Sequence, residues 1–561
     1  MNLIHVYIQE HKAVRNLNIS LGGKAECLVK DQIVDVSFRR DTTIYYRNYH
    51  CSAIIGANGV GKSSVLDFIE SAYFPTDSSG LLIFLDDANS LHICQINYSV
   101  FGCAIPFERH DDYEVFAKNH NISLIKINNV SSAQAKFGYG RKHRHPLIQE
   151  RSLEEYARTK SQRKKYFKNL LSYYRWDQTE NNLIQDVGFE FTFDNSSNKM
   201  SAVFPIDLLE TESQNEFRKA LLYFEETRNL KRSVNSTIEV TTYLIELNLV
   251  SLFVELAAQV GGDQRKPVLA MLIFYFLKSH LFRKNTDISE CILQALEALR
   301  YEENWTISLE ESFSESARYD FESRPIDVDS MHERFESLQD LLNDIAESLR
   351  NRRTEINDSG SLIVLIEEFE PVSKIVHLAS MLPRNLLSNI SWGWRGVSTG
   401  EMARSHLFSE TYNCSTGSKY RHPIIVIDEA DLYLHPEWQR TFLDSYLNLL
   451  DRLDWRSSKP QLLFTTHSPI IVSDFLPQDI VSLFKDQDGV VRVKDSLGFG
   501  TNITNLFIDG MHIESTIGEH SRKAIVSLMQ NANTQSLSDL DRELVNSMGN
   551  KFVREFLLKN D

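Results

Sequence analysis

The sequence predicts an α/β fold in which two strand-rich regions flank a mainly helical one. Residues 1–110 contain short β-branched runs separated by turn residues, which is typical of strands. Residues 150–355 instead repeat apolar side chains at i, i+3 and i+4 spacing, which indicates helices. Strand-like runs return between residues 361 and 486, and a helical tail closes the chain.

Composition places the chain among soluble proteins of a reducing compartment. Its six cysteines form no C-x-x-C pair, so neither a disulfide framework nor a zinc site is expected from them. The longest apolar run, residues 267–282, is interrupted by Lys278 and is too short to cross a bilayer. The N-terminus lacks the apolar core of a signal peptide. We therefore predict a cytoplasmic protein with no membrane partner.

The first strand-rich region contains a hairpin and a glycine-rich loop. Residues 80–99 read as two strands joined by the turn sequence "DDANS". Residues 53–68, "AIIGANGVGKSSVLDF", place an apolar strand, a glycine-rich bend and a helix in direct succession. The bend fits G-x-x-x-x-G-K-[ST] in full, and an accidental glycine-rich turn is a poor alternative in this strand–loop–helix context.

Such a loop cradles phosphate, because glycines let backbone N–H groups turn inward and the helix N-terminus adds partial positive charge. Lys62 is expected to reach the β- and γ-phosphates of ATP, and the Ser63 hydroxyl to bind Mg²⁺. The predicted ATP-binding residues of this loop are Gly56, Ala57, Asn58, Gly59, Val60, Gly61, Lys62, Ser63 and Ser64.

The helical middle begins with a basic segment. Between Arg141 and Arg175 there are eleven Lys or Arg and three Glu, interleaved with tyrosines, a phenylalanine and, just after, Trp176. Cations can neutralise phosphates while aromatic rings stack on unpaired bases. An amphipathic helix with a solvated basic face and an aromatic core stripe explains the pattern equally well. The net charge of −16 makes this local excess favour nucleic acid, and the candidate contacts are Arg141, Lys142, Arg144, Arg163, Lys164, Lys165 and Lys168.

The second strand-rich region supplies carboxylates to complete the phosphate site. Four apolar residues, 424–427, lead directly to Asp428 and Glu429. Ligands of open α/β sheets bind beyond the carboxyl ends of strands, so Asp428 is expected to hold the Mg²⁺ shell. Glu429 is placed to polarise an attacking water and is the predicted catalytic base. Acidic residues after a strand can simply cap a turn, but the intact glycine-rich loop favours the catalytic interpretation.

Two further motifs flank this acidic strand. Ser398-Thr399-Gly400-Glu401 precedes a helical run, and by itself it also reads as an ordinary helix N-cap. An apolar strand at 460–465 ends in Thr465-Thr466-His467-Ser468, where a lone histidine is commonly a polar turn residue.

Taken in this order, the motifs resemble those of ABC-type ATPases, and most closely the heads grouped with SMC, RecF and OLD proteins. "VSTGE" is similar to their "LSGGQ/LSSGE" signature, although Val397 and Thr399 depart from it. The resemblance implies that Ser398, Gly400 and Glu401 contact the γ-phosphate held by an opposite subunit, and that His467 senses that phosphate. It also implies that residues 434–436 form a D-loop and that Lys12 lies near the nucleotide.

The fold implied is a split, mixed sheet flanked by helices, with a large mainly helical insertion and a helical C-terminal tail. The expected boundaries are 1–140 and 361–496 for the two lobes of the head, 141–360 for the insertion and 497–561 for the tail. A Q-loop glutamine is also expected, with Gln134 and Gln95 as candidates. Because one chain holds one phosphate loop and one signature, a homodimer around two ATP molecules is implied.

The C-terminal residues suggest which system the predicted ATPase belongs to. Residues 497–525 resemble a segment of PtuA, the ATPase subunit of Septu-type antiphage systems, including those attached to retrons. The resemblance implies a separate HNH nuclease as partner and, in retron systems, a single-stranded DNA–RNA species and a reverse transcriptase. No nuclease motif follows His467 in this chain. A tail that only packs on the head is the structural alternative.

Three other functions stay open on the sequence alone. A RecF- or Rad50-like DNA-repair ATPase shares the head, although no C-x-x-C hook occurs. A transporter head is disfavoured by the long insertion, and an ATP-clamped scaffold with negligible turnover is disfavoured by the intact Glu429.

Overall fold

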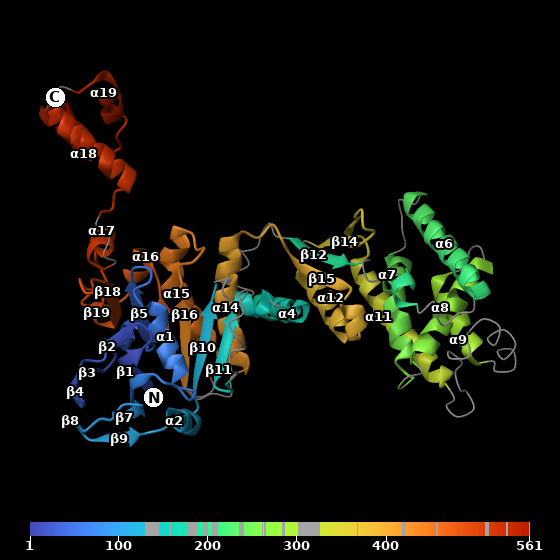
Figure 1. Cartoon of the computed structure of the whole chain (residues 1–561), viewed down its shortest axis with the longest axis horizontal. Helices are drawn as coiled ribbons and strands as arrows, with labels where there is room; N and C mark the ends of the chain where they lie inside the picture. The colour runs from blue at the N-terminus through green and yellow to red at the C-terminus, as the bar shows by residue number, and fades with distance from the viewer. Residues whose placement is uncertain are drawn as a thin grey trace. The chain divides into compact units, whose positions relative to one another are not determined.

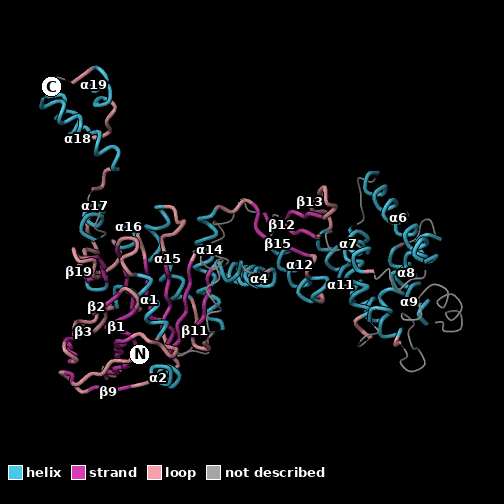
Figure 2. The backbone as a smooth tube through the Cα atoms, viewed as in Figure 1, coloured by secondary structure: helices cyan, strands magenta, loops and turns pink. Residues whose placement is uncertain are grey.

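The computed structural model describes most of the chain, and Figures 1 and 2 show the arrangement of its elements within each part. The described residues are 1–129, 145–157, 159–177, 188–194, 200–204, 211–234, 240–260, 262, 265–282, 287–300, 326–366, 369–417, 422–455, 458–510, 515–534 and 537–559.

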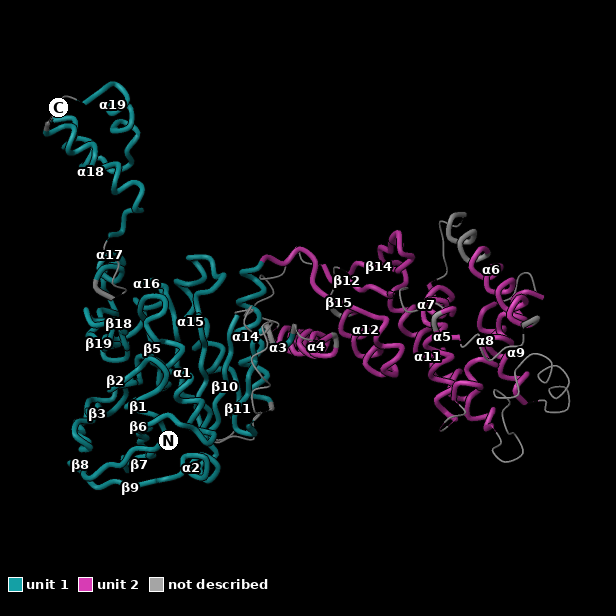
Figure 3. Tube along the Cα trace, viewed as in Figure 1, with its two compact units in different colours: residues 1–156, 399–561 teal, residues 157–398 magenta. Residues whose placement is uncertain are grey.

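The chain divides into two compact units, coloured separately in Figure 3. One unit comprises residues 1–156 and 399–561, and the other comprises residues 157–398. These boundaries differ from the predicted 141–360 insertion. Strand β11 (Ile148–Ser152) pairs with β10 (Ile122–Asn128), which keeps residues 145–156 with the first unit. At the other end, β14 (Leu362–Ile366) pairs with β12 (Gly188–Phe193) and so joins the second unit.

A seven-stranded sheet organises the first unit. Its strand order is β11-β10-β16-β17-β5-β18-β19, and every neighbouring pair is parallel except β18 and β19. The strands not yet bounded are β5 (His50–Gly56), β16 (His422–Asp428), β17 (Gln461–Thr465), β18 (Ile480–Lys485) and β19 (Val491–Lys494). The apolar runs of β5, β16, β17 and β18 are typical of strands buried on both faces, whereas the edge strand β19 is mostly exposed. The carboxyl ends of β16, β17 and β5 therefore lie side by side.

A second, five-stranded sheet has the order β2-β1-β6-β7-β9. Its strands are β1 (Asn2–His11), β2 (Val14–Ser20), β6 (Ser79–Leu85), β7 (Leu91–Ile96) and β9 (Phe107–His110). The antiparallel pairing of β6 with β7 confirms the hairpin predicted for residues 80–99. A separate three-stranded sheet consists of β3 (Ala25–Lys30), β4 (Ile33–Phe38) and β8 (Gly102–Cys103).

Helix α1 (Lys62–Ser71) contributes to one hydrophobic core with both larger sheets. Val65, Phe68 and Ile69 of this helix cluster with Ile8 of β1 and Ile54 of β5. The other described helices of the first unit up to its last strand are η1 (Thr43–Tyr46), α2 (Tyr113–His120), α3 (Leu153–Ala157), α14 (Thr399–Gly417), α15 (Pro436–Arg452), α16 (Pro469–Val472) and η8 (Pro477–Asp479). This core fixes α1 and β5 against each other, and with them the loop that joins the two.

The second unit is mainly helical, as predicted. Its strands β13 (Arg353–Ile356), β14, β12 and β15 (Ile390–Arg395) form an antiparallel sheet in that order. Its described helices are α4 (Lys160–Trp176), α5 (Met200–Val203), α6 (Thr211–Val234), α7 (Val240–Ala257), α8 (Arg265–Phe282), α9 (Ile288–Arg300), α11 (Val328–Leu349), α12 (Phe369–Met381) and α13 (Arg384–Leu387). They share a single hydrophobic core with the sheet.

Helix α7 is the one described helix long and apolar enough to cross a membrane. However, 72% of its apolar window is buried inside the protein, where it packs on α8 and α11. That burial is what a core helix shows.

The C-terminal residues form α17 (Ile503–Asn505), a π-helical turn η9 (Leu506–Gly510), α18 (Glu519–Thr534), α19 (Asp539–Asn546) and α20 (Lys551–Lys559). The last three helices have a small core of their own, built on Leu528, Leu537, Val545 and Leu557. The predicted helical tail is therefore present.

Candidate functional site

The glycine-rich loop lies between β5 and α1, where its sequence places it. Gly56, Gly59 and Gly61 all have positive φ. At Gly56 a side chain is excluded sterically as well, because a Cβ there would lie 2.3 Å from the carbonyl oxygen of Leu483. Gly61 is the N-cap of α1 with φ of 113°. Ala57, Asn58 and Gly59 are exposed, so the outer rim of the loop is open to a ligand.

Lys62 is the buried cation of this loop. Its Nζ donates to the carbonyl oxygens of Gly56, at 2.9 Å, and of Ala57, at 3.2 Å. Burial lowers the pKa of Lys62, and the nearby carboxylates of Glu429 and Asp428 oppose that change. Two neutral carbonyls leave the ammonium without a counter-charge at hydrogen-bonding distance among the described residues. A phosphate oxygen would supply one. Ser63, next in the chain, is exposed at the first turn of α1.

The carboxylates Asp428 and Glu429 follow β16, and Thr465 at the end of β17 connects them. The Thr465 hydroxyl donates to Asp428 Oδ1 and accepts from the backbone N–H of Glu429 at 2.7 Å. Glu429 itself has φ of 52°, an uncommon conformation for a glutamate. One hydroxyl therefore fixes the direction of the first carboxylate and the backbone of the second.

Hydrogen bonds also connect Asp431, which follows β16, with the residues after β17. Asp431 Oδ1 accepts from Thr466 Oγ1 at 2.6 Å and from the backbone N–H of His467 at 2.9 Å. Sequence reasoning assigns no role to Thr465 or Asp431, although both lie within the motifs "TTHS" and "DEAD". Their role is structural positioning, which depends on the pairing of β16 with β17.

Burial and neighbouring charges shift the pKa values of Glu429 and His467 in opposite directions. Burial raises the pKa of Glu429, and the negative charges of Asp428 and Asp431 raise it further. Burial lowers the pKa of His467, and the charge of Lys62 adds to this, which favours the neutral imidazole. A glutamate with a raised pKa accepts a proton more readily than an ordinary one, as a general base must.

The start of helix α14 lies close to residues 433–438 of the same chain. Helix α14 starts at Thr399, directly after the exposed Ser398, and Glu401 lies in its first turn. A Cβ at Gly400 would lie 2.8 Å from the carbonyl oxygen of Tyr433 and 2.9 Å from the Trp438 ring. Gly400 is thus required for the close approach of α14 to residues 433–438.

Lys12 and the glutamine candidates lie in different surroundings. Lys12 occupies the β1–β2 turn with φ of 52° and forms an ion pair with Asp67 of α1. This places its ammonium over the helix that begins at the loop. Gln95 is buried on β7 of the five-stranded sheet, where its side-chain oxygen accepts a hydrogen bond from Val100 N. It is therefore engaged away from the carboxyl ends of β5, β16 and β17. Gln134 lies outside the described residues.

The basic segment is described in part. Arg163, Lys165 and Lys168 are exposed on α4, whereas Lys164 donates to the carbonyl of Leu387 and lies over the Trp392 ring. The aromatic rings of Tyr156, Phe167 and Tyr173 are buried, at 8% exposure or less, and cannot stack on bases in this conformation. The amphipathic-helix interpretation accounts for these rings. Arg141, Lys142 and Arg144 lie outside the described residues.

Comparison with known proteins identifies the family. The model of the AAA ATPase domain matches residues 34–472, a range that includes the glycine-rich loop, Asp428 and His467. The chain belongs to the AAA ATPase domain family. It is also 32% identical over 98 residues to Septu protein PtuA from Bacillus thuringiensis, a match that covers 17% of this chain and 23% of that protein. The match to PtuA is therefore partial, while the ATPase-domain match spans most of the chain.

The Thr465 bridge gives a first prediction. Thr465→Val keeps the side-chain shape but leaves the Glu429 N–H without its acceptor. We expect the free energy of unfolding to fall by about 1–3 kcal/mol, the cost of an unsatisfied buried donor, and the ATPase rate to fall with it. Urea unfolding and steady-state ATPase assays measure the two effects. Thr441→Val is the matched control, because that hydroxyl bonds within its own helix. Equal losses in both variants would contradict the prediction.

Proposed function

We propose that this chain binds Mg²⁺–ATP at residues 56–64 and hydrolyses the bond between its β- and γ-phosphates. The observation that carries the proposal is the meeting of the loop, Asp428–Glu429 and His467 at three adjacent strand ends. Lys62 and the loop N–H groups hold the β- and γ-phosphates, and Ser63 and Asp428 hold Mg²⁺. Held there, Mg²⁺ would supply positive charge that neutralises the phosphate oxygens.

In this mechanism Glu429 orients the attacking water and accepts its proton. Its raised pKa and its fixed backbone suit that role. His467 in its neutral form can donate one ring N–H to a γ-phosphate oxygen, and its position is held through Asp431. These residues would therefore act mainly by positioning the water and stabilising phosphate charge, as in other phosphoryl transfers.

We infer further that the head is of the ABC type and that two copies enclose two ATP molecules. The order of the motifs supports this, as do the exposed Ser398 before α14 and the close approach of Gly400 to Tyr433 and Trp438, on either side of residues 434–436. Each nucleotide would lie between the loop of one chain and Ser398, Gly400 and Glu401 of the other. ATP then closes the pair and hydrolysis opens it.

We propose an antiphage role of the Septu or retron type, in the cytoplasm, with an HNH nuclease as the regulated partner. The partial similarity to Septu protein PtuA supports this role. Of the predicted nucleic-acid contacts, Arg163, Lys165 and Lys168 are described and exposed, and would be available for single-stranded nucleic acid, including the DNA–RNA species made by a retron reverse transcriptase. A RecF- or Rad50-like repair ATPase is the alternative.

A mixing experiment tests the dimeric site. Lys62→Met disables the loop, and Ser398→Glu puts negative charge where the opposite γ-phosphate would lie. At an ATP concentration well below the dissociation constant of Lys62→Met, each variant alone should have little activity. In an equal mixture half of the dimers are mixed, and each holds one intact site, so about a quarter of the wild-type ATPase rate should return. No recovery on mixing would contradict shared sites while leaving nucleotide binding intact.

Purification from the native genomic context tests the biological role. A co-purifying HNH nuclease with a short DNA–RNA species supports the defence proposal. A bare ATPase dimer that stimulates a repair nuclease on broken DNA supports the alternative.

A further inference from the structure

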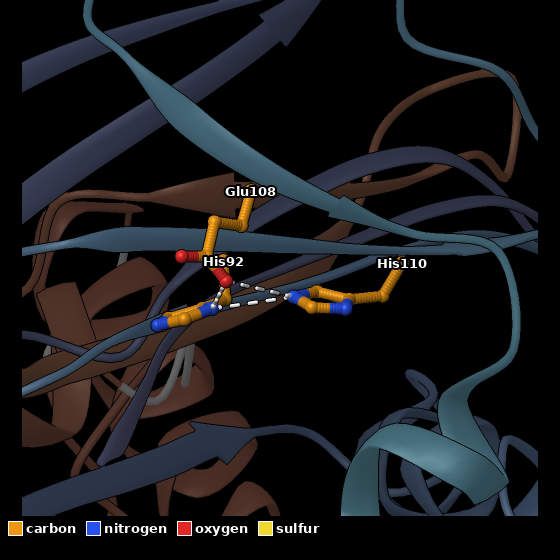
Figure 4. Close-up of side chains that lie close together, drawn as sticks. All are labelled: His92, Glu108 and His110. Atoms are coloured by element: carbon orange, nitrogen blue, oxygen red, sulfur yellow. Dashed lines mark hydrogen bonds and ion pairs between the residues drawn. The ribbon is translucent and has the colours of Figure 1, made fainter.

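Two histidines and a glutamate that belong to none of the ATP motifs converge where β7 pairs with β9 (Figure 4). The two strands are parallel, with His92 opposite Glu108 and Cys94 opposite His110. Because side chains alternate along a strand, Glu108 and His110 project on the same face of β9. Figure 4 shows His92 on the neighbouring strand pointing to that same place.

The separations between the ligand atoms suit a metal ion. His92 Nδ1 lies 3.2 Å from His110 Nε2 and 3.3 Å from Glu108 Oε2, and the latter two atoms are 3.9 Å apart. Two donor atoms that each bind a tetrahedral zinc ion at about 2.0–2.1 Å lie about 3.3 Å from one another. Two of the three separations already have this value, and a small rotation of the Glu108 side chain would provide the third.

Hydrogen bonds alone satisfy this arrangement poorly. When the His92 proton lies on Nε2, the His92 Nδ1 lone pair and the Glu108 carboxylate share one donor, the Nε2–H of His110, which can bond well to only one of them. A cation binds the lone pairs of all three groups at once.

The tautomer that metal binding requires is favoured by Asp86. His92 is 4% exposed, and its Nε2 is buried without a hydrogen bond among the described residues. Asp86 Oδ2 lies 3.7 Å from this nitrogen. A carboxylate on that side favours the proton on Nε2 and leaves the Nδ1 lone pair for a ligand, which is the common histidine–carboxylate support of metal sites.

We propose that His92, Glu108 and His110 bind one divalent transition-metal ion, with Zn²⁺ as the expected ion. Two imidazoles and one carboxylate form a ligand set that zinc accepts, and water can fill the fourth position from the exposed side, where Glu108 is 66% accessible. Hard cations such as Mg²⁺ prefer all-oxygen ligands and are not expected here. The ion would join β7 to the four-residue strand β9, next to helix α2.

Zinc analysis of the full-length, nucleotide-free chain tests this proposal. After removal of metal with EDTA and equilibration with buffered free Zn²⁺, we expect about one zinc per chain. Glu108→Gln and His110→Ala should each weaken zinc binding at least tenfold, because loss of even a supporting residue costs about 10–100-fold. His332→Ala is the matched control, since the partly exposed His332 faces Glu336 at 3.5 Å on helix α11. It should bind zinc like the wild type.

Two further measurements test the coordination geometry and the independence of this site from the ATP site. Co²⁺ in place of zinc should give the visible absorption of a tetrahedral site in the wild type and lose it in His110→Ala. Asp428→Asn should keep its zinc, because Asp428 belongs to the ATP site. The proposal is overturned if the wild type takes up no zinc at micromolar free ion, if Glu108→Gln and His110→Ala bind zinc as the wild type does, or if zinc is lost only in Asp428→Asn.

Discussion

Glu429→Gln will lower the rate of ATP hydrolysis by about 10²–10⁴-fold, the usual loss when a general base is removed, while ATP binding persists. The amide has nearly the same size as the carboxylate and cannot accept the proton of the attacking water. Because the backbone of Glu429 is held by Thr465 rather than by its own side chain, the local structure should survive. Steady-state ATPase assays and binding of a fluorescent ATP analogue measure the two properties separately.

The pH dependence offers an internal check on the same residue. Glu429 acts as a base only when ionised, and burial raises its pKa. The wild-type rate should therefore fall on acidification, and begin to fall at a higher pH than an ordinary glutamate would dictate. Glu429→Gln should lack this acidic limb. The control is Glu543→Gln, an exposed position on α19, which should keep both rate and profile. An unchanged rate in Glu429→Gln would exclude Glu429 as the base.

Lys62→Met will weaken ATP binding by about 10–150-fold, which corresponds to the 1.5–3 kcal/mol of a hydrogen bond to a charged group. The methionine keeps the apolar stem in its buried position but removes the ammonium, which otherwise faces two loop carbonyls. Isothermal titration with ATP measures the dissociation constant.

Lys12→Met tests whether charge alone explains such an effect. Lys12 is exposed and pairs with Asp67 of α1, so its removal should change ATP affinity much less than removal of Lys62. Equal losses in the two variants would mean that the binding energy comes from the general positive field rather than from the loop lysine.

The sequence is a good guide where one short segment carries a whole function. The strand, the loop and helix α1 lie within residues 50–71, so their relation can be predicted from residue types alone. The strand preceding Asp428 and the turn after residue 465 are recognisable for the same reason. Their adjacency follows from the parallel pairing of β16, β17 and β5, which only the structure supplies.

Prediction is weaker where long-range pairing decides the outcome. Strand β14 has the apolar sequence of a head strand, yet it pairs with β12, about 170 residues earlier, and so belongs to the second unit. The aromatic residues of α4 suggest a stacking surface when only their spacing is considered, but Phe167 packs against Phe189 and Trp394. Likewise, nothing in the spacing of His92, Glu108 and His110 indicates that two strands bring them together.

The exchange of bonds between β16 and β17 has a consequence for timing. Thr465 holds Asp428 and the backbone of Glu429, while Asp431 holds Thr466 and the backbone of His467. Each strand end thus anchors the other, so a shift of His467 is coupled to a shift of Glu429. A force applied to either strand end, for example by a docked protein, would change the hydrolysis rate and thereby the lifetime of the ATP-bound state. The same hydrogen bonds would then set the hydrolysis rate and transmit the effect of the docked protein.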